Sequence, residues 1–215
     1  MGAQDLLYVN FWGLAGNGKS TLFRKVVEAF GEDAYVLRKD TTRKPRPGEI
    51  GNPEYRYVPW GQFTNRVDRK QYRYEPERIL EGGEMNLTGV PKWKFLPEIP
   101  PGKLLVASIF PVDLRFPVPY TDRQIINILV FVYDIKKIEA RLKKRSGTDK
   151  ASFRFKMNLN KAWRKRTLEG HPPHYYHPRV FTHAVCNDGS IEETMEYLAR
   201  IIPGLRERLQ QQKRL

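Results

Sequence analysis

Eight residues near the start of the chain have the types and spacing needed to bind phosphate. They read Gly-Leu-Ala-Gly-Asn-Gly-Lys-Ser over 13–20, which matches G-x-x-x-x-G-K-[ST]. Glycines let successive backbone N–H groups turn toward phosphate oxygens, the lysine reaches the outer phosphates, and the hydroxyl can bind Mg²⁺. The sequence therefore predicts a site for ATP and Mg²⁺, with Ser20 at the metal. The expected ATP contacts are Gly13, Leu14, Ala15, Gly16, Asn17, Gly18, Lys19, Ser20 and Thr21.

The segments on either side of this loop are those that a phosphate-binding loop requires. Residues 6–12 form an apolar run of strand length, and residues 21–30 place Leu22, Val26 and Phe30 at helical spacing. A chance glycine-rich turn would not be expected between a strand and a helix in this order.

A second candidate phosphate site follows in the turn-rich stretch 38–58. Its prolines and glycines prevent a helix, so Arg43 and Arg46 are expected on an extended loop. Two guanidinium groups can bind a phosphate as a fork. The alternative is a solvated basic loop.

This stretch resembles the acceptor-phosphate loop of guanylate kinases. The matching residues run Thr41-Thr42-Arg43-x-Pro45-Arg46-x-Gly48-Glu49 and end at Tyr55, with Gly51 one residue early. The resemblance implies that Arg43, Arg46 and Tyr55 hold the phosphate of the acceptor nucleotide. It also implies an adenine contact at Asn187 and lid arginines that neutralise the transferring phosphoryl group, at Arg141, Arg145 and Arg154.

The residues that would read a guanine base match this family poorly. Asn86-Leu-Thr-Gly-Val90 replaces an Asn-Tyr-Tyr-Gly-Ser/Thr segment, and Ser108 stands where a carboxylate is expected. Glu75 or Glu77 could supply the base-binding glutamate. Loss of buried polar partners weakens discrimination between bases, so the guanine contacts are expected to be largely absent.

Asp40 suggests a different acceptor. Asp40 and Arg43 form Asp-x-x-Arg after the second expected strand, which is similar to polynucleotide kinases, where the aspartate is the general base for a hydroxyl. A hydroxyl acceptor benefits from such a base, whereas a monophosphate is already ionised. The alternative is that Asp40 caps a turn or pairs with Arg38 or Arg43.

The charge of the chain favours polyanionic partners. The net charge is +14, and residues 141–166 carry eleven Lys or Arg against one acid. Besides the lid arginines, these cations indicate either a solvated helix face or a nucleic-acid track. Aromatic and basic residues interleaved over 61–97 suit base stacking, or equally a small lobe with a thin core.

Other features narrow the class of protein. The single Cys186 excludes an internal disulfide framework, and no apolar run reaches the length of a membrane span, so a soluble cytoplasmic protein is expected. The histidines 171, 174 and 177 lie in a proline-rich loop for which a fixed structural role is favoured over metal binding. Asp113 is a weak candidate for the acid that often follows a strand near Mg²⁺.

These features predict a three-layer α/β P-loop kinase with a parallel sheet core. The expected divisions of this single domain are a core (1–38, 98–140 and 180–215), an inserted acceptor-binding lobe (39–97) and a lid (141–179). The expected reaction is ATP-dependent phosphoryl transfer to a phosphate-bearing nucleotide acceptor. A hydroxyl on DNA or another polynucleotide, with Asp40 as catalytic base, is narrowly favoured over a free nucleoside monophosphate or another small phosphate ester.

Overall fold

A computed structural model of the chain describes residues 7–46, 49–72, 77–81, 84–92, 102–109, 125–146, 150–168 and 181–214. Asp113, Glu75 and the histidines 171, 174 and 177 therefore lie outside the described residues. Glu77 and Arg145 lie within described elements, but their side chains are not described.

A five-stranded parallel sheet forms the centre of the molecule. Its strands, in spatial order β2-β7-β1-β8-β9, are all paired in parallel. Parallel neighbours need crossover connections, which fits the helices between them. The predicted α/β fold with a parallel sheet core is confirmed. The strands are β1 (Tyr8–Trp12), β2 (Ala34–Leu37), β7 (Leu104–Ala107), β8 (Ile125–Phe131) and β9 (His183–Cys186).

The alternation of side chains along β1 places apolar groups on both faces of this sheet. Val9 and Phe11 belong to the large core that includes Phe23 of α1 (Lys19–Phe30) and Leu198 of the C-terminal region, whereas Tyr8 packs on the opposite face. Because both faces are covered, β1 is apolar at almost every position. The phosphate loop begins at Gly13, directly after the last residue of this buried strand.

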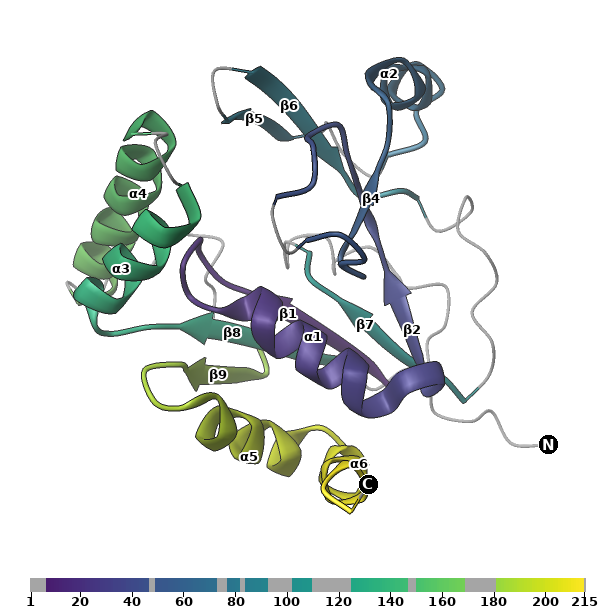
Figure 1. Cartoon of the computed structure of the whole chain (residues 1–215), viewed down its shortest axis with the longest axis vertical. Helices are drawn as coiled ribbons and strands as arrows, with labels where there is room; N and C mark the ends of the chain where they lie inside the picture. Colours follow the sequence, from purple (N-terminus) through teal and green to yellow (C-terminus); the bar gives the residue numbers. More distant parts are fainter. Residues whose placement is uncertain are drawn as a thin grey trace.

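Two C-terminal helices complete the core beside α1 (Figure 1). These are α5 (Ile191–Ile201), which follows β9, and α6 (Leu205–Gln212), which contacts α1. Ser190 and Glu193 form a reciprocal capping box at the start of α5. Residues 210–212 form the last turn of α6.

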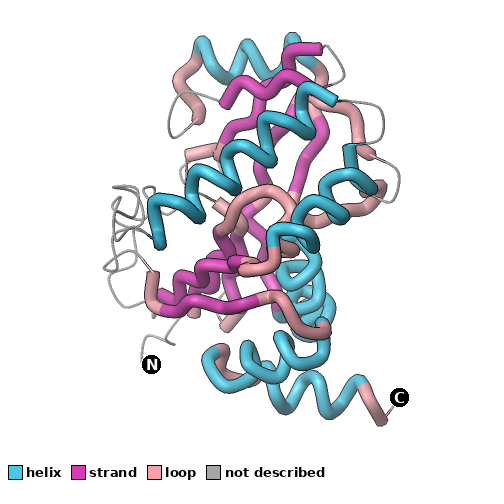
Figure 2. Tube along the Cα trace, turned by 90° about the vertical axis from the view of Figure 1, so that its left-hand side faces the viewer, coloured by secondary structure: helices cyan, strands magenta, loops and turns pink. Residues whose placement is uncertain are grey.

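A second sheet carries the candidate acceptor loop. Its strand order is β4-β3-β6-β5, with β3 parallel to β4 and antiparallel to β6. Figure 2 shows this sheet at one end of the molecule and the C-terminal helices at the other. Its elements are β3 (Lys39–Thr41), β4 (Tyr55–Tyr57), α2 (Trp60–Asp68), β5 (Glu77–Glu81) and β6 (Glu84–Gly89).

The aromatic residues of the 61–72 segment form the small core of this second sheet. Phe63 is fully buried and stacks on Tyr72 with ring centroids 4.5 Å apart, beside Val58. These rings are therefore packed against protein and are not presented to bases. Of the two interpretations of the interleaved segment, the structure supports the thin core for its described part.

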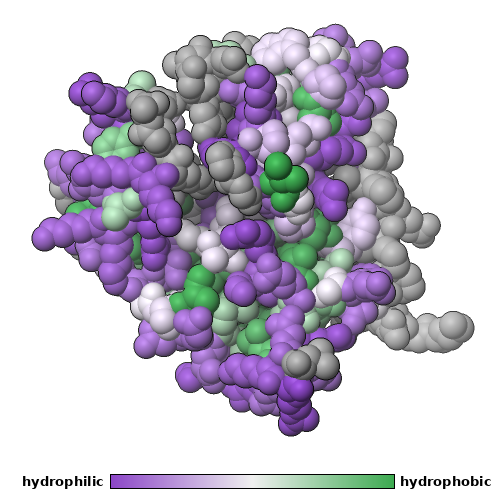
Figure 3. All heavy atoms as spheres, viewed as in Figure 1, coloured by the Kyte–Doolittle hydropathy of each residue, from purple (hydrophilic) through white to green (hydrophobic). Residues whose placement is uncertain are grey.

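A pair of helices projects beside the phosphate loop. These helices, α3 (Ile135–Ser146) and α4 (Lys150–Leu168), pack together through Leu142 and Met157, with Ala15 of the loop against them. Hydrophilic side chains cover much of the outer surface on this side of the molecule (Figure 3). A short 3₁₀ helix, η1 (Gly31–Asp33), links α1 to β2.

Candidate active site

The phosphate loop joins β1 to α1 in a conformation that requires glycine. Gly16 and Gly18 have positive φ angles of 88° and 86°, a region that residues with a side chain rarely adopt. A Cβ atom on Gly13 would lie 2.3 Å from the backbone oxygen of Val130, and one on Gly18 would lie 2.1 Å from Nδ2 of Asn187. The glycines therefore permit the turn and the close approach of the Val130 backbone and the Asn187 side chain.

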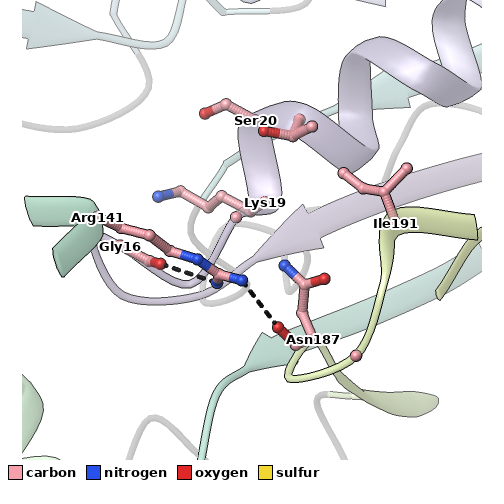
Figure 4. A pocket seen from close by; sticks show the side chains of 9 residues that line it. Gly16, Lys19, Ser20, Arg141, Asn187 and Ile191 are labelled. Atoms are coloured by element: carbon pink, nitrogen blue, oxygen red, sulfur yellow. Dashed lines mark hydrogen bonds between the residues drawn. The ribbon is translucent and has the colours of Figure 1, made fainter. Parts of the chain in front are cut away.

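This loop borders a cavity of about 320 Å³ at the start of α1 (Figure 4). Backbone N–H groups at the start of a helix, with the positive end of its dipole, favour an anion in such a place. The position therefore suits a polyphosphate. The cavity is lined by Gly16, Gly18, Lys19, Ser20, Thr21, Arg141, Asn187, Gly189 and Ile191.

Side chains from distant segments support the loop from behind. Asn17 is buried and donates through Nδ2 to the backbone oxygen of Val130 at 3.2 Å, while Asn160 of α4 donates to the backbone oxygen of Ala15 at 3.1 Å. Asn187 donates through Nδ2 to the backbone oxygen of Asn17 at 2.8 Å. The loop shape is thus held by hydrogen bonds within the protein.

Arg141 of α3 contacts both sides of this cavity. Its guanidinium donates to the backbone oxygens of Gly16 and Asn187 at 3.3 and 3.2 Å (Figure 4). Of the three lid arginines in the prediction, the structure therefore brings Arg141 to the loop. Arg154 is exposed on α4 and is not among the cavity-lining residues in the described part of the chain.

The two arginines of the candidate acceptor loop converge on one carboxylate. Arg43 Nη1 donates to Glu49 Oε2 at 2.6 Å, and Arg46 Nη1 donates to Glu49 Oε1 at 3.2 Å. The hydroxyl of Tyr57 also donates to Glu49 Oε2, and the Arg43 guanidinium lies 5.0 Å from the ring centre of Tyr55. The predicted trio of Arg43, Arg46 and Tyr55 is thus brought together.

Glu49 orients this cluster without cancelling its charge. Burial would raise the pKa of Glu49, but hydrogen bonds from Arg43 and from the Arg46 backbone, with the charges of both arginines, lower it to about 2. Among the described residues of this cluster, one carboxylate against two guanidinium groups leaves a net positive charge for an incoming anion. Glu49 belongs to the matched sequence pattern and Tyr57 lies two residues after its end, but the pattern did not indicate these roles.

Asp40 has an environment that differs from that of a catalytic base. It is fully buried at the centre of β3, where Arg56 Nε donates to Oδ1 at 2.6 Å and Tyr72 donates to Oδ2 at 2.9 Å. Arg66 of α2 also donates to Oδ2. Both oxygens are occupied, and Arg43 is not among these donors. These contacts do not support Asp40 as the base for a hydroxyl. They support the alternative in which Asp40 pairs with arginine, although the partners are Arg56 and Arg66.

A buried carboxylate that the sequence did not single out lies near the phosphate loop. Glu54 is 1% exposed, and its Oε1 accepts from Lys39 Nζ at 2.8 Å. Burial would raise the pKa of Glu54, but the charges of Lys39 and Lys19 and hydrogen bonding from Lys39 and Ser20 lower it to about 2. Glu54 is therefore ionised beside two cavity residues. Only the folded chain reveals this, because 34 residues separate Ser20 from Glu54.

The described parts of the expected base site carry few charged groups. Ser108 is buried after β7, and its hydroxyl has no hydrogen-bond partner among the described residues. Asn86 is also buried, in β6. No cluster of three metal-ligating side chains occurs within the described ranges. None of the described helices is both long and apolar enough to cross a membrane.

Comparison with known proteins relates this chain to guanylate kinases. It is 27% identical over 207 residues to the guanylate kinase of Ruegeria sp., covering 94% of this chain and 85% of that protein. Identity is 25% over 143 residues with the enzyme of Synechococcus elongatus (66% and 73%) and 26% over 134 residues with that of Campylobacter jejuni (62% and 63%). No family model matches the chain.

A solved structure supports the fold. The guanylate kinase from Anaplasma phagocytophilum superposes with a TM-score of 0.54 at 17% identity, covering 95% of this chain and 86% of that one. The parallel sheet and the phosphate loop at the start of α1 define a P-loop kinase. In sequence the chain is similar to guanylate kinases, which indicates an ATP-dependent kinase.

Proposed function

We propose that the chain is a nucleoside monophosphate kinase, which transfers the γ-phosphoryl group of ATP to the phosphate of a free nucleotide. The observation that carries this proposal is the Arg43–Arg46–Tyr55 cluster, which retains net positive charge on the second sheet. The burial of Asp40 supports the same choice, because a phosphate acceptor needs no base. A DNA hydroxyl as acceptor has no such support.

In this reaction an oxygen of the acceptor phosphate forms a bond to the γ-phosphorus. The bond from that phosphorus to the oxygen bridging the β- and γ-phosphates breaks, and ADP leaves with the electron pair. Lys19 and Arg141 lie in the same cavity and would neutralise charge on the transferring group. Arg43 and Arg46 would hold and orient the acceptor.

Magnesium fits the groups present at this site. The Ser20 hydroxyl lines the cavity, and the buried Oε2 of Glu54 lacks a hydrogen-bond partner among the described residues. Hydroxyl and carboxylate oxygens suit Mg²⁺, which usually takes one or two protein ligands besides phosphates and water. When bound, the ion would neutralise phosphate charge. Ser20 would hold it.

The acceptor is tested with γ-labelled ATP and a panel of substrates. The panel contains the ribo- and deoxyribonucleoside monophosphates, and DNA oligonucleotides with normal and hydroxylated bases. We expect label in a nucleoside diphosphate and none in DNA, with GMP and dGMP as the first candidates because the relatives are guanylate kinases. Because residues 86–90 and Ser108 differ from the base-reading residues of guanylate kinases, the preferred base is determined by this experiment. Label in DNA with none in any diphosphate would overturn the proposal.

Removing either acceptor arginine should weaken binding of the acceptor more than binding of ATP. In Arg43→Ala and Arg46→Ala, loss of a charge-assisted contact should cost about 1.5–3 kcal/mol, which is roughly 10- to 150-fold in the acceptor KM. Lys44→Ala is the matched control, since Lys44 is an exposed cation of the same loop. Steady-state kinetics with each substrate varied will measure this. A rise confined to the KM for ATP would contradict the placement.

A further inference from the structure

Glu54 combines burial, negative charge and an unused oxygen beside the phosphate loop. It precedes Tyr55 at the start of β4, and Lys39 binds its Oε1 at 2.8 Å. Its Oε2 is buried and meets no donor at hydrogen-bonding geometry among the described residues; the Ser20 hydroxyl interacts with the carboxylate but does not meet that geometry. A buried carboxylate oxygen without a donor is costly, so its persistence calls for a ligand.

Two groups of the phosphate loop interact with this carboxylate. The Lys19 ammonium and the Ser20 hydroxyl both act on the Glu54 carboxylate, and both line the cavity at the start of α1. When ATP binds, its triphosphate attracts the Lys19 ammonium and so weakens the interaction between Lys19 and Glu54. Glu54 then faces added negative charge with Lys39 as its remaining close cation. A divalent cation between the carboxylate and the phosphates would satisfy both.

We propose that Glu54 is the carboxylate of the magnesium site, binding the ion of Mg·ATP together with the Ser20 hydroxyl, directly or through a bound water. This deepens the proposed function and rests on its ATP part alone. It places the metal-binding acid one residue before Tyr55 of the acceptor cluster. The metal ion and the acceptor would thus be positioned by adjacent residues of one segment.

The competing explanation is that Glu54 serves only as the partner of Lys39. Lys39 also lies 4.6 Å from the centre of the Tyr55 ring, so this ion pair could simply fix the start of β4. In that case Glu54→Gln and Lys39→Gln would both lower stability, and neither would change the effect of magnesium. The two variants therefore form a matched pair that removes one charge each from the same contact.

The test measures binding of ADP by calorimetry, once with EDTA and once with saturating Mg²⁺. The ratio of the two Kd values gives the effect of the metal without turnover. In Glu54→Gln we expect this ratio to fall by about tenfold or more, which is the size of typical metal-site losses. Metal-free ADP should bind at least as tightly, because a negative charge is removed. Lys39→Gln should keep the wild-type ratio.

An unchanged ratio in Glu54→Gln, with ADP still bound, would overturn the inference and leave the kinase proposal intact. Absence of ADP binding by the wild-type protein would instead overturn the kinase proposal. If Glu54→Gln does not fold, Fe²⁺ can replace Mg²⁺ in the wild-type ADP complex, and added H₂O₂ and ascorbate then generate oxidative cleavage close to the bound iron. We expect ADP-dependent cuts near both Ser20 and Glu54. Cuts near Ser20 without any near Glu54 would also overturn the inference.

Discussion

Lys19→Ala is expected to lower turnover by at least about 10²-fold while leaving the fold unchanged, because its ammonium stabilises charge on the transferring phosphoryl group. Lys19 lines the open cavity and is not part of the apolar core. Its interaction with Glu54 is shared with Lys39, so the loss should not expose an unpaired carboxylate. Turnover at saturating acceptor, with circular dichroism of the same sample, will measure both effects.

Lys25→Ala is the matched control for this experiment. Lys25 lies on the same helix, and its side chain is half exposed in an ion pair with Glu28. Exposed pairs of this kind contribute little, so Lys25→Ala should retain normal turnover. Undiminished turnover in Lys19→Ala would remove the basis for assigning the phosphate loop.

Asp40→Asn is expected to destabilise the second sheet rather than to affect chemistry alone. The substitution removes the charge that Arg56 and Arg66 share across β3, β4 and α2. Breaking a buried pair typically costs 3–5 kcal/mol, and about 3 kcal/mol is expected here because both arginines keep access to water. Urea unfolding will measure the change in the free energy of unfolding.

A catalytic base would give the opposite pattern, namely normal stability and a turnover about 10²-fold lower. Asp68→Asn is the control, because it makes the same chemical change at an exposed position at the end of α2. An Asp40→Asn protein as stable as Asp68→Asn, with turnover lost on its acceptor, would restore the assignment of Asp40 as a base.

The phosphate loop could be predicted because its signals are local. The strand, the glycines, Lys19 and the following helix are contiguous in sequence, and the structure keeps them contiguous in space. The grouping of Arg43, Arg46 and Tyr55 could also be predicted, since these residues lie within thirteen residues of one another. Such short-range patterns carry both chemistry and geometry.

Asp40 and Glu54 show why other parts of the site could not be predicted. The partners of Asp40 lie 16, 26 and 32 residues away, and which of them reach it depends on how β3 pairs with β4 and where α2 packs. Spacing instead suggested Arg43, three residues along, which binds Glu49. Glu54 interacts with Ser20 only because the segment before β4 packs near the phosphate loop. No sequence pattern indicates this tertiary contact.

The two hydrogen bonds of Arg141 have a consequence for the thermodynamics of nucleotide binding. Its guanidinium is held by two neutral backbone oxygens, at 3.3 and 3.2 Å. Bonds to an anion are shorter and roughly twice as strong, so a polyphosphate can displace these acceptors with little reorientation of the side chain. Much of the rotamer entropy of this long side chain is therefore surrendered during folding, and the nucleotide meets a cation that is already immobilised.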